Sequence, residues 1–548
     1  MSLVSTLPST VQDANVGVIG GGISGLSFAY FLGKLKPNYR IKVFEQSDRT
    51  GGYIYSQPTQ VPDAKSTVLE KGPRTLRGVS EGTLIMLDLL DKFQLQNTIM
   101  GVHKNAPANK KYLLSPSSKK LVQVPDSFSS LVRFISDPLG RSLPVAMGRE
   151  FFTIHRGTGK EETMDQFFSR HFGKGLCDNI LSAVMHGIYA ADVSTLSVKA
   201  VMPRMVEIEH KSASIGRYAV LKALFGSSSK EKSDKPQLST SLAKYQELFS
   251  PRLDLGKTSK FLSSFPMTVL KGGLGGLPKA IADNLPPNVE VVYNSDITSL
   301  EPSSTGKVKI TYKDGSEEFD HVRSTINVQK LGSFIKSPEL KEVFSKVPYS
   351  SVVLANVYVP QKNILPVSGF GFLVPKASVD ESKLLGVIFD SEVEHSARPL
   401  FTEAVKKELT SSEVTSPERY KQLGDEVLAS DPVITRPYTK VTFMLGGYMY
   451  DNENEFPTST EIKNIVENTF NNIIKSPISD YHIEVGSARD AIPQYNVGYL
   501  DLKDQAWKLS KSQFNGALSF GGMTFADGVG VPDCVMSSFK DATKLAGL

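Results

Sequence analysis

Three glycines near the start of the chain, Gly20, Gly22 and Gly25, have a spacing that brings the backbone close to a bound phosphate. Apolar residues 16–19 precede them as an expected strand, and apolar residues at helical spacing follow from 26 to 32. The unpaired N–H groups at the start of such a helix attract anions. The pattern therefore predicts a pyrophosphate site, and a purely structural turn between strand and helix is the alternative.

A second apolar strand ends at Glu45, twenty residues after Gly25. A carboxylate at this distance can accept hydrogen bonds from both ribose hydroxyls of an adenosine, and it repels a 2′-phosphate. The turn and the acid together predict a dinucleotide held by Gly20, Gly21, Gly22, Ile23, Ser24, Gly25, Glu45 and Gln46.

Arg49 and the glycine pair Gly51–Gly52 follow the acid directly. The pair brings further backbone to the same phosphates, which NAD-binding domains do not need. This arrangement resembles the FAD-containing amine oxidase superfamily, whose signature is a dinucleotide fingerprint followed by an arginine and two glycines. The resemblance implies bound FAD. We expect the flavin to be non-covalent, because no cysteine lies between Cys177 and Cys534, and Cys534 falls after the expected flavin contact.

Three distant segments complete the cofactor site that the resemblance implies. The "EKGPRTLRG" segment places Gly72, Pro73, Arg74 and Thr75 near the flavin ring, and an apolar strand around Val291 lies against the adenine. A C-terminal glycine turn places Val529, Gly530 and Val531 at the flavin, with the start of the last helix toward the pyrimidine end. The positive end of a helix would stabilise an anionic reduced flavin there.

Within the superfamily the chain is similar to the protoporphyrinogen oxidase family, and most to its fungal branch. The segments that carry this likeness are "HGIYAADVSTLS", "GFGFLVPK" and "IPQYNVGYL", in which Tyr499 stands where histidine is usual. The resemblance implies an oxidoreductase of heme biosynthesis that converts protoporphyrinogen IX to protoporphyrin IX by hydride transfers to the flavin. It also implies O₂ as the electron acceptor and H₂O₂ as the product.

The resemblance assigns three substrate contacts and no catalytic side chain. The Gly187 carbonyl would face the pyrrole N–H groups, Phe389 would stack on a pyrrole, and Lys111 would pair with a propionate in place of the usual arginine. A solvated turn is the alternative for Lys111. We expect no metal, because the eight histidines form no ligand-spaced group, and no Ser/His/Asp set is evident.

The length of 548 residues predicts two or three domains. The net charge of +5 is too small for a nucleic-acid-binding protein. The fold class expected is α/β, or α+β when the whole chain is considered, with a discontinuous Rossmann-like FAD-binding domain. That domain comprises residues 14–102, 262–328 and 485–548. A helical membrane-associated domain covers 103–205, and an α+β substrate-binding domain covers 206–261 and 329–484.

Residues 125–156 predict an amphipathic surface. Phe128, Leu131, Val132 and Ile135 share a helical face, and four arginines are interspersed, Arg133, Arg141, Arg149 and Arg156. Such a face lies in a membrane interface or packs on a core. The resemblance implies a peripheral position on the mitochondrial inner membrane, and also a homodimer and hand-over of product to ferrochelatase.

Two other functions are compatible with the motifs. Another superfamily enzyme, such as a polyamine oxidase or a desaturase, would prefer spermine or another substrate over protoporphyrinogen. A non-enzymatic escort protein resembling the Rab GDP-dissociation inhibitors would hold no flavin. The acid Glu45 and the full set of glycine turns argue against the escort protein.

Overall fold

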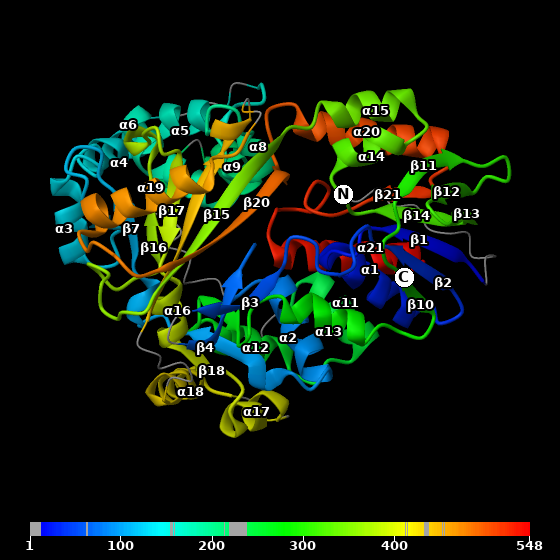
Figure 1. The fold of residues 1–548 in the computed structure, drawn as a ribbon, viewed down its shortest axis with the longest axis horizontal. Helices are drawn as coiled ribbons and strands as arrows, with labels where there is room; N and C mark the ends of the chain where they lie inside the picture. The colour runs from blue at the N-terminus through cyan, green and yellow to red at the C-terminus, as the bar shows by residue number, and fades with distance from the viewer. Residues whose placement is uncertain are drawn as a thin grey trace.

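The computed structural model describes residues 13–61, 64–153, 157, 159–212, 214–218, 238–411, 413, 415–431, 438–451, 453 and 455–548. Its two largest sheets lie in different halves of the molecule (Figure 1). A five-stranded sheet contains the dinucleotide turn, and a seven-stranded sheet faces the helices of the 128–212 region. This is the mixed α/β and α+β architecture that the sequence predicts.

The five-stranded sheet is entirely parallel and assembles three separated segments of the chain. Its strand order is β10 (Val289–Val292), β2 (Arg40–Phe44), β1 (Asn15–Ile19), β14 (His321–Ser324) and β21 (Leu518–Phe520). Parallel neighbours require crossover connections, which the helices and the long insertions supply. The discontinuous Rossmann-like prediction is confirmed.

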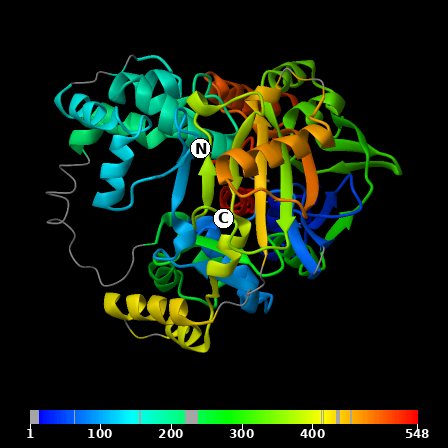
Figure 2. The same cartoon turned by 60° about the vertical axis from the view of Figure 1, so that its left-hand side comes forward.

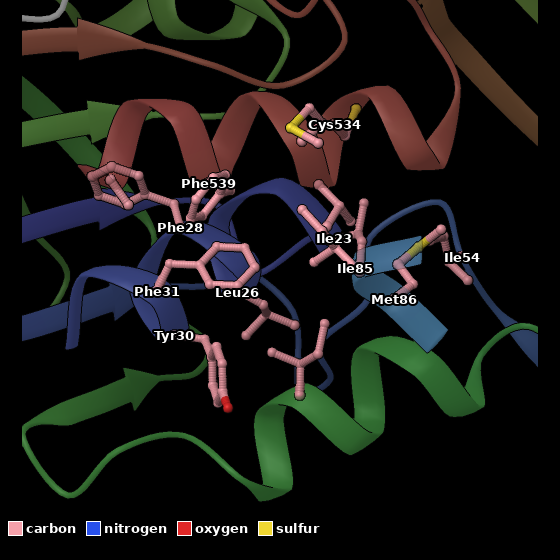
Figure 3. Packing of buried hydrophobic residues seen from close by; sticks show 14 of the residues in the cluster. Ile23, Leu26, Phe28, Tyr30, Phe31, Ile54, Ile85, Met86, Cys534 and Phe539 are labelled. Atoms are coloured by element: carbon pink, nitrogen blue, oxygen red, sulfur yellow. The ribbon is translucent and has the colours of Figure 1, made fainter. Parts of the chain in front are cut away.

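Two helices that begin beside this sheet, α1 (Ile23–Leu35) and α21 (Val531–Leu545), pack against each other. The rings of Phe31 and Phe539 lie 5.5 Å apart in an edge-to-face arrangement, and Figure 3 shows α21 running alongside α1. Helix α13 (Gly276–Asp283) packs against α1 and also against α2 (Glu81–Lys92). Helix α1 is therefore buried along nearly its whole length.

On the other face of the parallel sheet lies a three-stranded antiparallel sheet. Phe44 of β2 packs edge-to-face on Phe319, with ring centroids 5.8 Å apart. Its strands are β11 (Ile297–Pro302), β12 (Val308–Tyr312) and β13 (Gly315–Phe319).

The seven-stranded sheet is antiparallel except for one parallel pair, β16 with β7. One of its faces packs on α19 (Ser459–Thr469) and the turn that follows, where Phe443 contacts Phe470. The strand order is β20 (His482–Pro493), β15 (Tyr349–Val359), β19 (Thr439–Gly447), β17 (Leu384–Ile388), β16 (Gly371–Leu373), β7 (Lys111–Leu114) and β8 (Leu121–Gln123).

Helices α3 to α9 gather at one side of the seven-stranded sheet (Figure 2). They are α3 (Phe128–Ser136), α4 (Leu143–Phe152), α5 (Met164–Phe172), α6 (Lys174–Leu176), α7 (Ser182–Tyr189), α8 (Val198–Val201) and α9 (Pro203–Ser212). The remaining helices are α11 (Thr240–Phe249), α12 (Leu255–Leu262), α14 (Val328–Phe334), α15 (Pro338–Ser345), α16 (Asp390–Ser396), α17 (Glu403–Thr410), α18 (Pro417–Ala429) and α20 (Tyr499–Gln513).

Two small sheets connect the halves. One is the hairpin of β3 (Ser56–Val61) and β4 (Ala64–Glu70). The other is antiparallel, with the order β18 (Ala397–Pro399), β6 (Ile99–Val102), β9 (Met267–Leu270) and β5 (Leu76–Arg77).

The structure shifts three predicted domain boundaries. Strands β7 and β8 lie in the 103–205 segment, which was expected to be helical, but they extend the seven-stranded sheet. Strand β20 belongs wholly to that sheet, although residues from 485 were assigned to the FAD-binding domain. Helix α11, assigned to the substrate domain, packs instead on the FAD-binding half, because the Tyr245 hydroxyl donates to Asp88 at 2.5 Å and its ring meets Phe31.

Candidate functional site

The predicted pyrophosphate turn joins β1 to α1 and lies against the second glycine pair. A Cβ on Gly25 would overlap the carbonyl oxygen of Gly20, so only glycine fits there. The Gly51 amide donates to the Gly21 carbonyl at 2.9 Å, and the Cα of Gly22 is 3.3 Å from the position that a Cβ on Gly52 would take. The two glycine motifs therefore form one backbone cradle.

Glu45 directly follows β2 and lies beside this cradle. One carboxylate oxygen accepts the Gly21 amide at 2.8 Å, and the other accepts the Ser47 amide at 2.9 Å. Val291 lies on the adjacent strand β10, level with Val43, and the Glu45 amide donates to the Val292 carbonyl at 2.9 Å. The predicted ribose acid and the predicted adenine edge thus occupy neighbouring strand ends.

Two exposed or half-exposed side chains of the same region have partners on the protein. The Arg49 guanidinium donates to the Gly52 carbonyl at 3.0 Å and lies 4.2 Å from the centre of the Tyr55 ring. Gln46 donates to Asp296 at 2.9 Å. The cationic head of Arg49 is therefore held next to the glycine cradle, where a pyrophosphate would need it.

The C-terminal segment reaches the same place. The Ser538 hydroxyl donates to the Ser24 carbonyl at 2.9 Å, so the second turn of α21 touches the first turn of α1. Gly530 is the N-cap residue of α21, and its amide donates to the Asp533 carboxylate at 3.1 Å. Burial raises the pKa of Asp533 above its ordinary value. The segments around Gly20–Gly25 and Val529–Val531 therefore lie on the same side of the molecule, although they stand near opposite ends of the sequence.

These residues fit an FAD molecule. Among the described residues no side chain caps the start of α1, and its first turn contains no acid, so its N–H groups suit a pyrophosphate. A Cβ on Gly22 would find no atom closer than 3.9 Å, which leaves the cradle open to a ligand. Gly20 to Gly25, Glu45 and Gly51–Gly52 would hold the adenosine and phosphates, and Val529 to Val531 the flavin end.

The predicted flavin segment 72–75 connects the cofactor half to the seven-stranded sheet. A Cβ on Gly72 would overlap the Tyr53 carbonyl oxygen, and Pro73 is exposed. The Arg74 guanidinium donates to the Asp390 carboxylate at 2.7 Å and to the Thr442 hydroxyl. The Arg74 side chain therefore joins two parts of the fold, and it is the backbone of this segment that stays available to a flavin. Half-buried Thr75 ends it.

The face of the seven-stranded sheet opposite α19 has two aligned cross-strand rows. The first row, which is apolar, consists of Leu113, Leu373, Gly386, Met444, Leu354 and Gly486. The second row consists of Lys111, Gly371, Ile388, Thr442, Asn356 and Glu484. Because side chains alternate along a strand, all these residues share one face.

The two rows differ in how they meet the cofactor half. In the second row Asn356 donates to the Glu70 carbonyl at 3.2 Å and Glu484 accepts Lys71 at 2.9 Å. In the first row Leu354, Leu373 and Met444 keep part of their surface exposed. The second row therefore joins the sheet to the cofactor half by polar contacts, and the first row leaves a partly exposed apolar surface.

Lys111 is exposed at the far end of the second row. It lies three strands from Thr442, which corresponds to about 14 Å at the usual strand spacing. The side chain is thus at the rim of the apolar surface, where an acidic group of a large apolar ligand could reach it. The pairing with a propionate stays a prediction.

Gly187 lies near the end of α7, directly against the first row. A Cβ on this residue would be 3.0 Å from a methyl group of Leu373. Within the described part of the chain, no group donates a hydrogen bond to the Gly187 carbonyl, which belongs to the last turn of the helix. Such a carbonyl is a free acceptor at the negative end of the helix dipole. It suits the pyrrole donors that the resemblance implies.

Phe389 lies elsewhere. Its side chain is 0% exposed and packs in the core behind the seven-stranded sheet, with its ring 6.2 Å from that of Phe372. No face of the ring is open to a macrocycle in this packing. The stacking predicted for Phe389 finds no support here, whereas the half-buried Ile388 and Leu373 lie on the opposite face of the sheet.

The sequence analysis missed the network of Thr442, Asp390 and Asn356. The Thr442 hydroxyl lies 2.7 Å from the Asp390 carboxylate and 2.8 Å from the Asn356 side-chain oxygen. Strand alternation indicates that Thr442 and Asn356 face one side of a sheet, but the register that brings them together cannot be read from one sequence.

Comparison with known proteins agrees with this site. The flavin-containing amine oxidoreductase family model matches residues 23–545. The chain is 35% identical to the protoporphyrinogen oxidase of Saccharomyces cerevisiae, with 97% of this chain and 98% of that protein covered. The chain belongs to the protoporphyrinogen oxidase family. FAD is accordingly its cofactor.

A second relative and a solved structure each match 97% of the chain. The protoporphyrinogen oxidase of Schizosaccharomyces pombe is 28% identical, with 97% and 99% of the two chains covered. A crystal structure from Exiguobacterium, assigned as a protoporphyrinogen oxidase, superposes with a TM-score of 0.69 at 16% identity, with 97% and 98% covered. That low identity supports the fold alone.

Proposed function

We propose that this chain oxidises protoporphyrinogen IX to protoporphyrin IX with FAD as cofactor and O₂ as electron acceptor. When bound, FAD supplies the two-electron oxidising chemistry, and three rounds with O₂ account for the six electrons removed and for three molecules of H₂O₂. The observation that supports this substrate is the free Gly187 carbonyl beside the partly exposed apolar row, a combination that suits a large apolar ring with N–H donors at its centre.

The protein's own residues bind, orient and shield the substrate. The row of Leu354, Leu373 and Met444 provides an apolar surface that excludes water. The Gly187 carbonyl accepts pyrrole N–H bonds and so fixes the plane of the ring. Lys111 at the rim attracts a propionate as a point charge, without the two-pronged geometry of arginine.

A substrate assay tests the proposal. The purified holoenzyme, mixed with protoporphyrinogen IX in air, should produce fluorescent protoporphyrin faster than the uncatalysed oxidation and release H₂O₂. Spermine should give no H₂O₂. Turnover of spermine without turnover of protoporphyrinogen would favour the polyamine oxidase alternative, and purified protein that neither contains nor binds FAD would favour the escort alternative.

We also propose that helices α3 and α4 dock on a membrane surface. Helix α4 is inverted relative to an ordinary surface helix: it buries Glu150 completely and exposes Val145 by 74% and Phe152 by 84%. On α3, Phe128 is 82% exposed. Burying a carboxylate while aromatic rings face outward stabilises a protein only if the outer face meets an apolar environment.

The buried Glu150 has specific partners that hold this arrangement. Its carboxylate pairs with His171 of α5 at 2.8 Å, and it accepts the Gly216 amide at 3.1 Å. The exposed cations Arg133, Arg141 and Arg149 surround the apolar side chains and suit anionic headgroups. Arg156 lies outside the described residues. None of the helices in the described part combines the length and the apolar character needed to cross a bilayer.

Vesicle flotation tests this docking. The protein should float with phosphatidylcholine–phosphatidylglycerol vesicles, and a Phe128→Ser/Phe152→Ser variant should bind at least about tenfold more weakly, because each exposed ring contributes roughly 1.5–3 kcal/mol on burial. Tyr293→Ser is the matched control. It removes a ring that is 42% exposed and that lies directly after β10, in the cofactor half. Equal binding of all three proteins would contradict the proposal. The mitochondrial inner membrane, the homodimer and the hand-over to ferrochelatase stay predictions.

A further inference from the structure

The turn between β21 and the flavin-end segment, residues 521–526, is held from two sides. On one side its amides bind the cofactor half: Gly521 donates to the Ser324 carbonyl at 2.7 Å, and Gly522 donates to the Ser24 hydroxyl at 3.1 Å. Ser24 belongs to the first turn of α1. One side of this C-terminal turn is therefore tied to the dinucleotide cradle.

On the other side, carbonyl groups of the C-terminal turn accept side-chain donors from the region of α20. The Tyr495 hydroxyl donates to the Met523 carbonyl, and the Tyr499 hydroxyl donates to the Thr524 carbonyl. The Lys503 ammonium donates to the Phe525 carbonyl at 3.2 Å. Successive carbonyls thus meet successive donors: Tyr495 lies in the segment before α20, and Tyr499 and Lys503 lie four residues apart on one face of that helix.

The same helix face continues with packing contacts. Trp507, four residues after Lys503, contacts Phe525 with ring centroids 5.6 Å apart. The Tyr495 and Tyr499 rings stack at 4.4 Å, and the Tyr349 hydroxyl reaches the Thr524 hydroxyl at 2.6 Å. The C-terminal turn is therefore bonded and packed from outside along most of its length.

Lys503 has an unusual set of neighbours for a cation. Its hydrogen bonds go to the Phe525 and Ala526 carbonyls of the turn, and its ammonium lies 5.7 Å from the centre of the Tyr499 ring. Burial lowers the pKa of Lys503 below its ordinary value. The nearby carboxylates of Asp527 and Asp541 only partly offset this effect. Desolvating an ammonium group opposes folding, so this residue is not explained by stability alone.

We propose that Tyr499 and Lys503 are positioning residues that set the C-terminal turn, and through it Val529 to Val531, against the flavin. The inference rests on the proposed function, because it requires FAD at this site. Neither side chain needs to touch the flavin or the substrate. Their effect passes through the backbone that leads from residue 526 to the start of α21.

Flavin binding and redox measurements test the role of Tyr499. Tyr499→Phe removes the hydroxyl and keeps the ring. We expect the apoprotein to bind FAD about threefold to tenfold more weakly, the effect of one lost hydrogen bond, and the midpoint potential of the bound flavin to fall. Tyr499→His restores a donor, as in the family pattern, and should recover both values. Tyr481→Phe is the matched control, because the Tyr481 hydroxyl contacts Glu467 of α19, behind the seven-stranded sheet and away from the C-terminal turn.

A second variant tests the same role independently, in case Tyr499→Phe does not fold. Lys503→Met keeps much of the side-chain volume and removes the charge; it should weaken FAD binding while the apoprotein melts at or above the wild-type temperature. If wild type binds FAD and both variants keep its affinity and potential, the positioning role is overturned, even if their melting temperatures change. If wild type itself binds no FAD, the proposed function fails instead.

Discussion

Arg74 and Asp390 form a buried ion pair, with nitrogen and oxygen 2.7 Å apart and about nine-tenths of each side chain shielded from solvent. Arg74 lies in the segment predicted to line the flavin, and Asp390 begins α16 beside the seven-stranded sheet. The Thr442 hydroxyl bonds to both of them. This pair therefore couples the place of the cofactor to the face on which the substrate is proposed to lie.

Arg74→Ala should destabilise the protein strongly. The substitution leaves the Asp390 carboxylate buried without its cation, which costs about 3–5 kcal/mol. The unfolding free energy from denaturant titration measures this loss. In the Arg74→Ala background, a further Asp390→Ala change should cost little or restore stability. A full additional loss in the double variant would mean that the two side chains act independently.

Gly25→Ala should disable the cofactor cradle, because its Cβ would overlap the Gly20 carbonyl oxygen. The turn must move by about 1 Å, and kcat/KM should fall by about a hundredfold. Gly276→Ala is the control, since a Cβ at that position would meet nothing within 4 Å. Steady-state kinetics with FAD in excess compares them, and equal activity of the two variants would contradict the cradle geometry.

Glu45→Ala should weaken FAD while the apoprotein stays folded. The carboxylate is expected to accept ribose hydroxyls, and two charge-assisted bonds are worth at least about tenfold in affinity. Quenching of flavin fluorescence on binding to apoprotein gives the dissociation constant, and circular dichroism reports the fold. Unchanged affinity would remove Glu45 from the site.

His321 should make the protein sensitive to acid. Burial, with Arg323 nearby, lowers the pKa of His321 to about 3 in the folded protein. The unfolded chain, with an ordinary pKa near 6.5, binds the proton first, so stability is complete above that value and decreases as the pH falls toward 3. Between about pH 7.5 and pH 5 this single group should cost about 2 kcal/mol.

The His321→Gln variant isolates the contribution of His321 to the pH dependence of stability. Glutamine can keep the hydrogen bond that His321 makes with the Ser519 hydroxyl at 2.7 Å, and it does not titrate. Its unfolding free energy, measured at several pH values, should fall less steeply than that of the wild type over the same window. Parallel pH curves for the two proteins would show that His321 is not responsible.

Both cysteines should be unreactive in the native protein. Burial raises the pKa of Cys177 and of Cys534 to about 12, so neither is a thiolate near pH 8. A thiol-specific disulfide reagent should therefore label both cysteines only after unfolding.

FAD should be released when the protein is denatured. Acid precipitation should leave all flavin in the supernatant. Flavin retained on the precipitated chain would contradict non-covalent binding.

The parts of the site that depend on local motifs could be predicted from the sequence. The glycine cradle and Glu45 lie within one βα turn and the next strand, so their spacing determines their geometry. The placement of Val529–Val531 near the glycine cradle followed only from the family resemblance, because nothing local links the two ends of the chain. The predicted fold class and FAD as the cofactor are confirmed. The contacts of these residues with FAD stay predictions.

The substrate side could not be predicted as well, because it depends on the register of distant strands. One sequence does not show that Lys111, Thr442 and Asn356 share a row, or that Phe389 points into the core behind the sheet. The boundaries at 103 and 485 failed for the same reason. A strand joins a sheet through partners that lie hundreds of residues away.

Anaerobic mixing of the purified holoenzyme with protoporphyrinogen IX tests the central claim most directly. The oxidised flavin absorbance should bleach on mixing and return when O₂ is admitted, with protoporphyrin formed in proportion. A flavin that stays oxidised in the presence of excess protoporphyrinogen, yet is bleached by dithionite, would contradict the account.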